Sequence, residues 1–165
     1  MTCACAALPD PAVLDMANPH PAWQQIEKVR DRGEPYWWLY AARCQSCGSP
    51  WLVAQEERQN DVILLHRLSN EELAVIVNDA RWPDTFDLYE TLLRLGRAAG
   101  HSVLWPDPLG DSSLEWTMAD LARQRPGISV EELAELLQLD IATAAALAER
   151  ARINHRASIR TEGAW

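Results

Sequence analysis

Apolar residues follow a strand-like pattern in one part of the chain and a helical spacing in another. Between residues 35 and 68, three short apolar and aromatic stretches (35–43, 51–58 and 62–68) are separated by a cysteine-containing turn and a polar turn, which predicts three strands of an antiparallel meander. Before them, Pro21 stands where a first helical residue would, and Trp23, Ile26 and Val29 recur at helical spacing. This spacing predicts a helix over 21–32, and residues 11–16 are compatible with one short helical turn.

From residue 69 onward the apolar period is helical. Ser69, Ser112 and Ser129 each stand three residues before a glutamate, which is the sequence pattern of a capping box at a helix start. Asp84 is a further candidate cap, and an Ala-rich segment over 141–153 predicts the last of five helices. Residues 101–105 form a short apolar piece that is compatible with an extra strand. The predicted fold class is α+β: a small antiparallel β-meander within a domain over 1–68, and a helical bundle over 69–165.

The four cysteines of the chain form two close pairs. Cys3 and Cys5 make one pair, and Cys44 and Cys47 make the other, followed by Gly48, which can adopt the positive φ that such a turn often needs. Paired thiolates are preferred ligands of tetrahedral zinc. The alternative, a redox pair at Cys44 and Cys47, lacks a βαβ context and leaves the first pair unexplained. We therefore predict one structural Zn²⁺ held by four cysteines, with no open position for catalysis.

Composition and charge restrict the classes of function that this chain could have. The formal net charge is −9, which opposes nucleic acid binding and favours a basic protein partner. No apolar run is long enough for a membrane span, and the N-terminus lacks the pattern of a secretory signal, so we expect a cytoplasmic protein with reduced thiols. The four histidines are scattered and no nucleophile or phosphate-binding motif is present, so an enzyme is not expected.

An acidic stretch lies between the second and third predicted strands. A solvated hairpin turn is the simplest interpretation. The functional interpretation places Trp51, Glu56, Glu57 and Asp61 on an anionic, aromatic face that binds arginines or lysines of a partner. Tryptophan supports either possibility, because the chain has eight and this residue is common both in cores and at interface hot spots.

The segment 128–151 resembles the helix-turn-helix of transcription regulators. In that family the start of the second helix reads bases through long polar side chains, whereas here Asp140, Ala142 and Thr143 occupy those places. A helical hairpin with a structural or docking role is the alternative. An arginine cluster near the C-terminus keeps a DNA-binding regulator, using residues 128–160, as the second functional hypothesis; its candidate contacts are Arg150, Arg152, Arg156 and Arg160.

Residues 35–68, with the Cys44–Cys47 turn, resemble a zinc ribbon and are similar to small bacterial proteins found as immunity proteins beside polymorphic toxins. That resemblance implies a cytosolic protein that neutralises a cognate toxin by binding and occluding it. The first functional hypothesis is therefore a non-enzymatic, protein-binding inhibitor of a basic partner.

Overall fold

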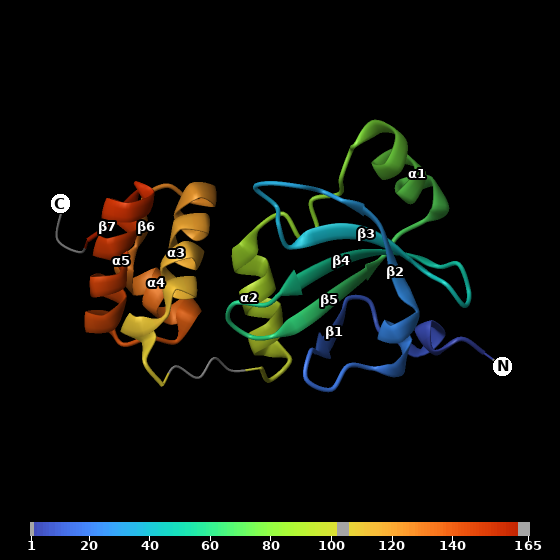
Figure 1. Cartoon of the computed structure of the whole chain (residues 1–165), viewed down its shortest axis with the longest axis horizontal. Coiled ribbons are helices and arrows are strands. Elements are labelled where there is room, and N and C mark those ends of the chain that lie inside the picture. The colour runs from blue at the N-terminus through green and yellow to red at the C-terminus, as the bar shows by residue number, and fades with distance from the viewer. Residues whose placement is uncertain (1, 102–105, 162–165) are drawn as a thin grey trace. The chain divides into compact units, whose positions relative to one another are not determined.

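The computed structural model describes residues 2–101 and 106–161 (Figure 1). It divides the chain into two compact units. The sheet unit comprises Met1–Glu57 and Asp61–Asp87, and the helical unit comprises Arg58–Asn60 and Leu88–Trp165. The predicted α+β class is confirmed, with a five-stranded antiparallel sheet and five α-helices in the described part of the chain.

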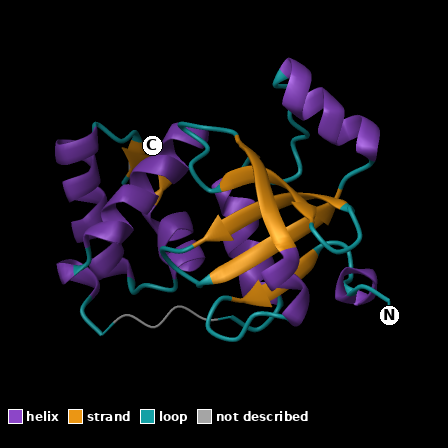
Figure 2. Ribbon diagram, turned by 45° about the vertical axis from the view of Figure 1, so that its right-hand side comes forward, coloured by secondary structure: helices purple, strands orange, loops and turns teal. Residues whose placement is uncertain are grey.

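The sheet has the strand order β1-β5-β4-β3-β2, and every neighbouring pair is antiparallel. The three predicted strands form its centre: β3 (Leu39–Cys44), β4 (Pro50–Glu56) and β5 (Val62–Arg67). Two further strands, β1 (Ala12–Asp15) and β2 (Ile26–Asp31), form the edges. The meander is therefore widened on both sides by segments that precede it in the chain (Figure 2).

The predicted helix over 21–32 is wrong. Pro21–Gln25 forms only a 3-10 helix, η2, and β2 follows it directly and pairs with β3. Val29 is one of the apolar residues at helical spacing. It falls at a register shift between Lys28 and Arg30 and is 45% exposed, so it does not belong to a buried helical face. Residues 11–16 likewise contain strand β1 instead of a helical turn. Pairing with β5 and β3, which local periodicity does not report, decided both segments.

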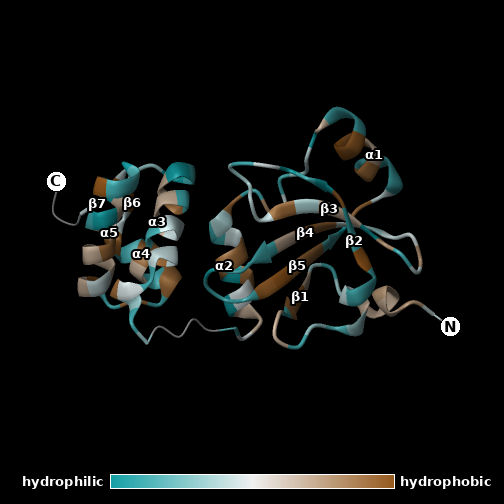
Figure 3. Cartoon of the chain, in the orientation of Figure 1, coloured by the Kyte–Doolittle hydropathy of each residue, from teal (hydrophilic) through white to brown (hydrophobic). Residues whose placement is uncertain are grey.

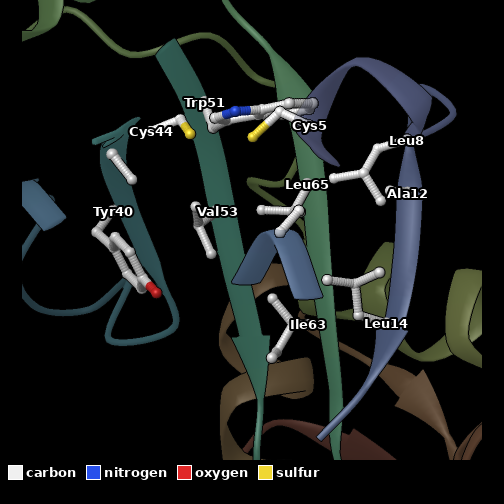
Figure 4. Packing of buried hydrophobic residues seen from close by; sticks show 12 residues of the cluster. Cys5, Leu8, Ala12, Leu14, Tyr40, Cys44, Trp51, Val53, Ile63 and Leu65 are labelled. Atoms are coloured by element: carbon white, nitrogen blue, oxygen red, sulfur yellow. The ribbon is translucent and has the colours of Figure 1, made fainter. Parts of the chain in front are cut away.

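One face of the sheet packs against the N-terminal segment. Alternate residues of the central strands, including Trp51, Val53 and Leu65, form a buried cluster with Leu8 and Leu14 (Figure 4). Two 3-10 helices, η1 (Ala4–Ala7) and η2, add residues to the same cluster. Both faces of β4 are buried, which explains why its sequence is apolar nearly throughout rather than alternating (Figure 3).

Helix α1 (Asn70–Asp79) belongs to the sheet unit. It begins at the predicted capping box, in which Ser69 Oγ accepts the Glu72 N–H and the Glu72 carboxylate accepts the Ser69 N–H. Its buried residues are Leu73 and Ile76, and Arg30 of β2 donates to the Ile76 carbonyl at 3.1 Å. The structure therefore keeps α1 with the strands, whereas the predicted domain boundary followed residue 68.

The helical unit contains α2 (Tyr89–Ala98), α3 (Ser112–Gln124), α4 (Val130–Leu137) and α5 (Ile141–His155). A 3-10 helix, η3 (Pro108–Gly110), precedes α3. Strands β6 (Ile128–Ser129) and β7 (Ile159–Arg160) form a two-stranded parallel sheet. The unit also includes the turn after β4, where Arg58 pairs with Asp120 at 2.8 Å.

Helix starts follow the predicted caps only in part. Ser129 and Glu132 form the predicted capping box of α4. The cap of α3, however, is Asp111, which accepts the Ser113 N–H at 2.8 Å, and Ser112 is already helical. Helix α2 begins at Tyr89 without a side-chain cap, so the predicted role of Asp84 is wrong.

The possible strand over 101–105 falls largely on residues outside the described part of the chain. Among the described helices, none has the length and apolar character to cross a membrane.

Candidate metal centre

The structure brings the four predicted ligands together. Cys3 precedes η1 and Cys5 lies within it, Cys44 ends β3, and Cys47 lies in the turn before β4. Their four Sγ atoms lie within 4.8 Å of one another, and Cys3 Sγ and Cys44 Sγ are 3.6 Å apart. This cluster could hold a metal ion, and it is consistent with a zinc-ribbon-like segment.

The turn between β3 and β4 presents the second pair. The Gly48 N–H donates to the Cys44 carbonyl at 2.8 Å, and the Cys44 N–H donates to the Ser49 carbonyl at 2.9 Å. Gly48 has φ +75°, and an added Cβ would meet no atom closer than 3.9 Å. The turn therefore requires glycine for its backbone conformation and not for lack of space.

Arg67 fixes the N-terminal pair against the sheet. Its guanidinium donates to the Cys5 carbonyl at 2.8 Å and to the Leu8 carbonyl at 3.0 Å. The same guanidinium carbon lies 4.4 Å from the centroid of the Trp51 ring. Arg67 thus places a positive charge beside the cysteine cluster, where four thiolates and a divalent ion would carry a net charge of about −2.

The four cysteine thiols differ in how far they are buried. Cys5 and Cys44 are each 1% exposed, Cys3 is half-buried and Cys47 is exposed. Hydrogen bonds from the hydroxyl and backbone N–H of Ser49 lower the pKa of Cys47 to about 6. A backbone hydrogen bond from Cys5, followed by one from the Ser46 side chain, lowers the pKa of Cys3, whereas burial raises that of Cys5.

These features fit a bound metal. Tetrahedral zinc with thiolate ligands places sulfur atoms about 3.8 Å apart, close to the Cys3–Cys44 separation. The Trp51 indole N–H is buried without a hydrogen-bond partner among the described residues, and Trp51 shares a cluster with Cys5 and Cys44 (Figure 4). Metal-bound thiolates are acceptors that suit such a donor. Four cysteine ligands would fill a tetrahedral shell, so the arrangement suits a structural metal.

The predicted partner-binding residues do not form one face. Trp51 and Glu56 are both 0% exposed, so neither belongs to a surface, and this part of the prediction is wrong. Both faces of β4 are covered, so the strand that carries Trp51 and Glu56 is buried on both sides. Glu57 and Asp61 are exposed, with Asp61 at φ +51° in the turn before β5.

The four arginines of the alternative DNA hypothesis are split between two roles. Arg150 donates to the Leu109 carbonyl at 2.5 Å, and Arg152 donates to the Ile159 carbonyl at 3.0 Å. Arg156 and Arg160 are exposed. Helices α4 and α5 follow one another closely, as the hairpin prediction requires, and Asp140 caps the start of α5 and accepts the Thr143 N–H. Half of the predicted cluster therefore stabilises the helical unit.

The structure contains two grooves that the sequence did not predict. One lies in the sheet unit, between α1 and the segment that follows it, and contains Trp82. The other lies in the helical unit beside Trp116, which is 53% exposed. Pattern alone could have drawn attention only to the two tryptophans, since grooves depend on which residues pack beside them.

Comparison with protein-family models, with curated proteins and with solved structures found no match.

Proposed function

We propose that this chain is a zinc-stapled, non-enzymatic binding protein that occludes a basic partner protein in the cytoplasm, in the manner of an immunity protein or antitoxin. The observation that carries the proposal is the distribution of charge between the two units. Residues 1–57 and 61–87 contain thirteen acidic and six basic side chains, a formal balance of −7. The remaining residues contain eleven acidic and nine basic side chains, a balance of −2.

The acidic sheet unit is also the unit with the candidate metal centre. A tetrathiolate zinc site adds about two further negative charges. A field of one sign accelerates association with a partner of the opposite sign and favours it over competitors. The staple has a separate task, because it fastens the N-terminal segment to the sheet.

The groove beside α1 is the place on this unit that best suits a basic side chain. It has a volume of about 370 Å³ and is lined by Glu71, Glu72, Val75, Arg81, Trp82 and Pro83. Trp82, Val75 and Pro83 offer apolar walls for the methylene stem of an arginine or lysine, and an indole face attracts its cationic end. The two carboxylates outnumber the single guanidinium of Arg81, whose side chain is 73% exposed and lies 3.5 Å from Asp79.

The experiment begins with the whole chain as bait in its native cell. A basic protein that is recovered is then purified and titrated against the chain by calorimetry at rising salt, and its own activity is measured in the complex. The proposal requires a 1:1 complex that weakens as salt increases and in which the partner's activity falls. Recovery of no partner, or of a partner that remains fully active when bound, would refute it.

Matched variants locate the binding face. Glu71 and Glu131 occupy the same position in two helices that begin with the same capping box. Glu71→Gln should weaken partner binding a few-fold, and Glu131→Gln should not, since rim charges contribute modestly and locally. Trp82→Ala should weaken binding about tenfold or more. Arg81→Gln should strengthen it, because the substitution removes the one cation among the residues that line the groove, although the Arg32 guanidinium also lies 5.9 Å from the centroid of the Trp82 ring. Weaker binding would instead indicate an anionic ligand.

The DNA-binding alternative remains open to a direct test. Substituting Arg150, Arg152 and Arg156 together with alanine should abolish retention on duplex DNA at low salt if the regulator hypothesis holds. Absence of duplex binding by the unsubstituted chain at low salt would exclude that hypothesis.

A further inference from the structure

A second groove in the helical unit differs in charge from the first. It has a volume of about 360 Å³ and lies between α3 and the end of α5. Four of its lining residues are small and apolar: Ala119, Ala122, Pro126 and Ala157. The others are Trp116, Asp120, Arg123, His155, Arg156 and Ser158. The groove therefore combines small apolar residues with polar and charged ones, which is the usual make-up of a binding site.

Trp116 provides an exposed ring whose position is fixed. Its ring centroid lies 4.2 Å from that of His155, with an interplanar angle of 51°. His155 in turn lies 3.3 Å from a Glu115 carboxylate oxygen, and Asn154 donates to the same oxygen at 2.6 Å. The ring is 53% exposed although one side rests on His155. A large aromatic ring held in place and left open to solvent is typical of an interface anchor.

The charges at this groove favour an anion. Its single carboxylate, Asp120, is buried and is paired with both Arg58 at 2.8 Å and Arg123 at 2.7 Å. The Arg156 guanidinium is exposed and has no hydrogen-bond or ion-pair partner among the residues that the structure describes, whereas the Arg156 backbone N–H donates to the Ala151 carbonyl at the end of α5. Among the residues that line the groove, the two guanidiniums of Arg123 and Arg156 thus exceed the one carboxylate of Asp120. A locally cationic groove stands out in a chain of net charge −9.

We infer that this groove binds an acidic peptide segment of a partner protein through one aromatic or large aliphatic side chain. The side chain of the peptide packs against Trp116 and the alanines that line the groove, and a neighbouring carboxylate pairs with Arg156. This inference does not depend on the proposed function, because the groove and its charges lie wholly in the helical unit and the ligand has the opposite charge.

An acidic peptide is a better ligand for this groove than nucleic acid, because it carries fewer negative charges for the whole chain to repel. The excess of negative charge over the whole chain repels a long polyanion, whereas one or two carboxylates respond mainly to the nearby arginines. Base stacking on Trp116 is the competing possibility, and the experiment includes it.

The test uses the whole chain labelled with ¹⁵N and four probes. The first is a blocked peptide of sequence Glu-Glu-Phe-Glu-Glu, and the others are Lys-Lys-Phe-Lys-Lys, Glu-Glu-Gly-Glu-Glu and an eight-nucleotide oligothymidylate. Only the first should shift the indole N–H signal of Trp116 and the backbone signals of Arg156 and Ala157 in a saturable way. Equal shifts with the lysine or glycine peptide, or tighter binding of the oligothymidylate, would overturn the inference.

Two variants on the same helix and its cap separate a local contact from a general charge effect. Arg156→Gln should weaken the acidic peptide about tenfold, as expected for the loss of one charge-assisted contact. Arg150→Gln removes the same charge from a residue that bonds to the Leu109 carbonyl and does not line the groove, so it should leave affinity nearly unchanged. Equal losses in both variants would refute the assigned site. Thermal unfolding of both variants confirms that they are folded.

Discussion

The Sγ atoms of Cys3 and Cys44 lie 3.6 Å apart, although the two residues are 41 positions apart in the chain. This separation is close to that of two thiolates on one tetrahedral zinc ion. The contact joins the segment before β1 to the end of β3, so a metal held there would link the first residues of the chain to the centre of the sheet.

Substitution of a buried ligand should remove the metal and destabilise the sheet unit. The wild-type chain should contain about one zinc ion, and Cys44→Ser should contain much less. We expect the loss of stability to be about 2–3 kcal/mol, which lowers Tm by roughly 5–10 °C. Metal analysis and thermal unfolding test this together. Gln45→Ser, at an exposed position in the same turn, is the control and should change neither quantity.

Cys47 should be the first cysteine to react when metal is removed. It is exposed and its pKa is lowered to about 6 by hydrogen bonds from Ser49, so it is a thiolate at neutral pH. Iodoacetamide followed by peptide mapping should therefore modify Cys47 before Cys5, whose pKa is raised by burial. The rate should rise as pH increases through about 6. Added zinc should protect Cys47, and equal labelling with and without zinc would contradict metal binding.

Substitutions at the start of α3 should distinguish the observed cap from the one that sequence predicts. Asp111 accepts the Ser113 N–H at 2.8 Å, whereas Ser112 lies inside the helix and is exposed. Asp111→Ala should cost about 1 kcal/mol of unfolding free energy, and Ser112→Ala should cost less than about 0.5 kcal/mol. Urea unfolding measures both. The opposite order would mean that the helix begins one residue later.

Trp51 should behave as a core residue. It is 0% exposed and lies beneath the Arg67 guanidinium in the cluster that contains Cys5 and Cys44. Trp51→Ala should cost about 3–5 kcal/mol, the usual range for a buried aromatic residue. Chemical denaturation measures this loss. A cost near zero, together with weaker partner binding, would restore the exposed role that the sequence suggested.

Acid should weaken the capping box of α4. The Ser129 N–H, followed by Arg125, lowers the pKa of Glu132, so the folded state favours the carboxylate. Its contribution to stability is fully present above the unfolded pKa of about 4.3 and is lost as pH falls through the lower folded value. Glu132→Gln should therefore destabilise the chain at pH 6 and have little effect near pH 2. Unfolding curves of both proteins across this range test the sign.

The capping boxes at Ser69 and Ser129 could be predicted because a helix start is a local event. Each box needs only a hydroxyl and a carboxylate three residues apart, and the sequence contains both. The prediction of a helix over 21–32 was wrong because strand pairing, which is not a local interaction, decided the structure of most of this segment. Residues 26–31 pair with β3, and the sheet edge that receives them is invisible in a window of twelve residues. The Trp82 and Trp116 grooves were missed for the same reason.

Residue type and short spacing were enough to predict the four cysteines of the candidate metal centre, the three central strands and most helices. Packing between distant segments then set which of these residues face solvent. It buried Trp51 and Glu56 by covering both faces of β4, and it engaged Arg150 and Arg152 with carbonyl groups while leaving Arg156 exposed. The exposure of a side chain depends on contacts between segments far apart in the chain, and the periodicity within one segment does not predict those contacts.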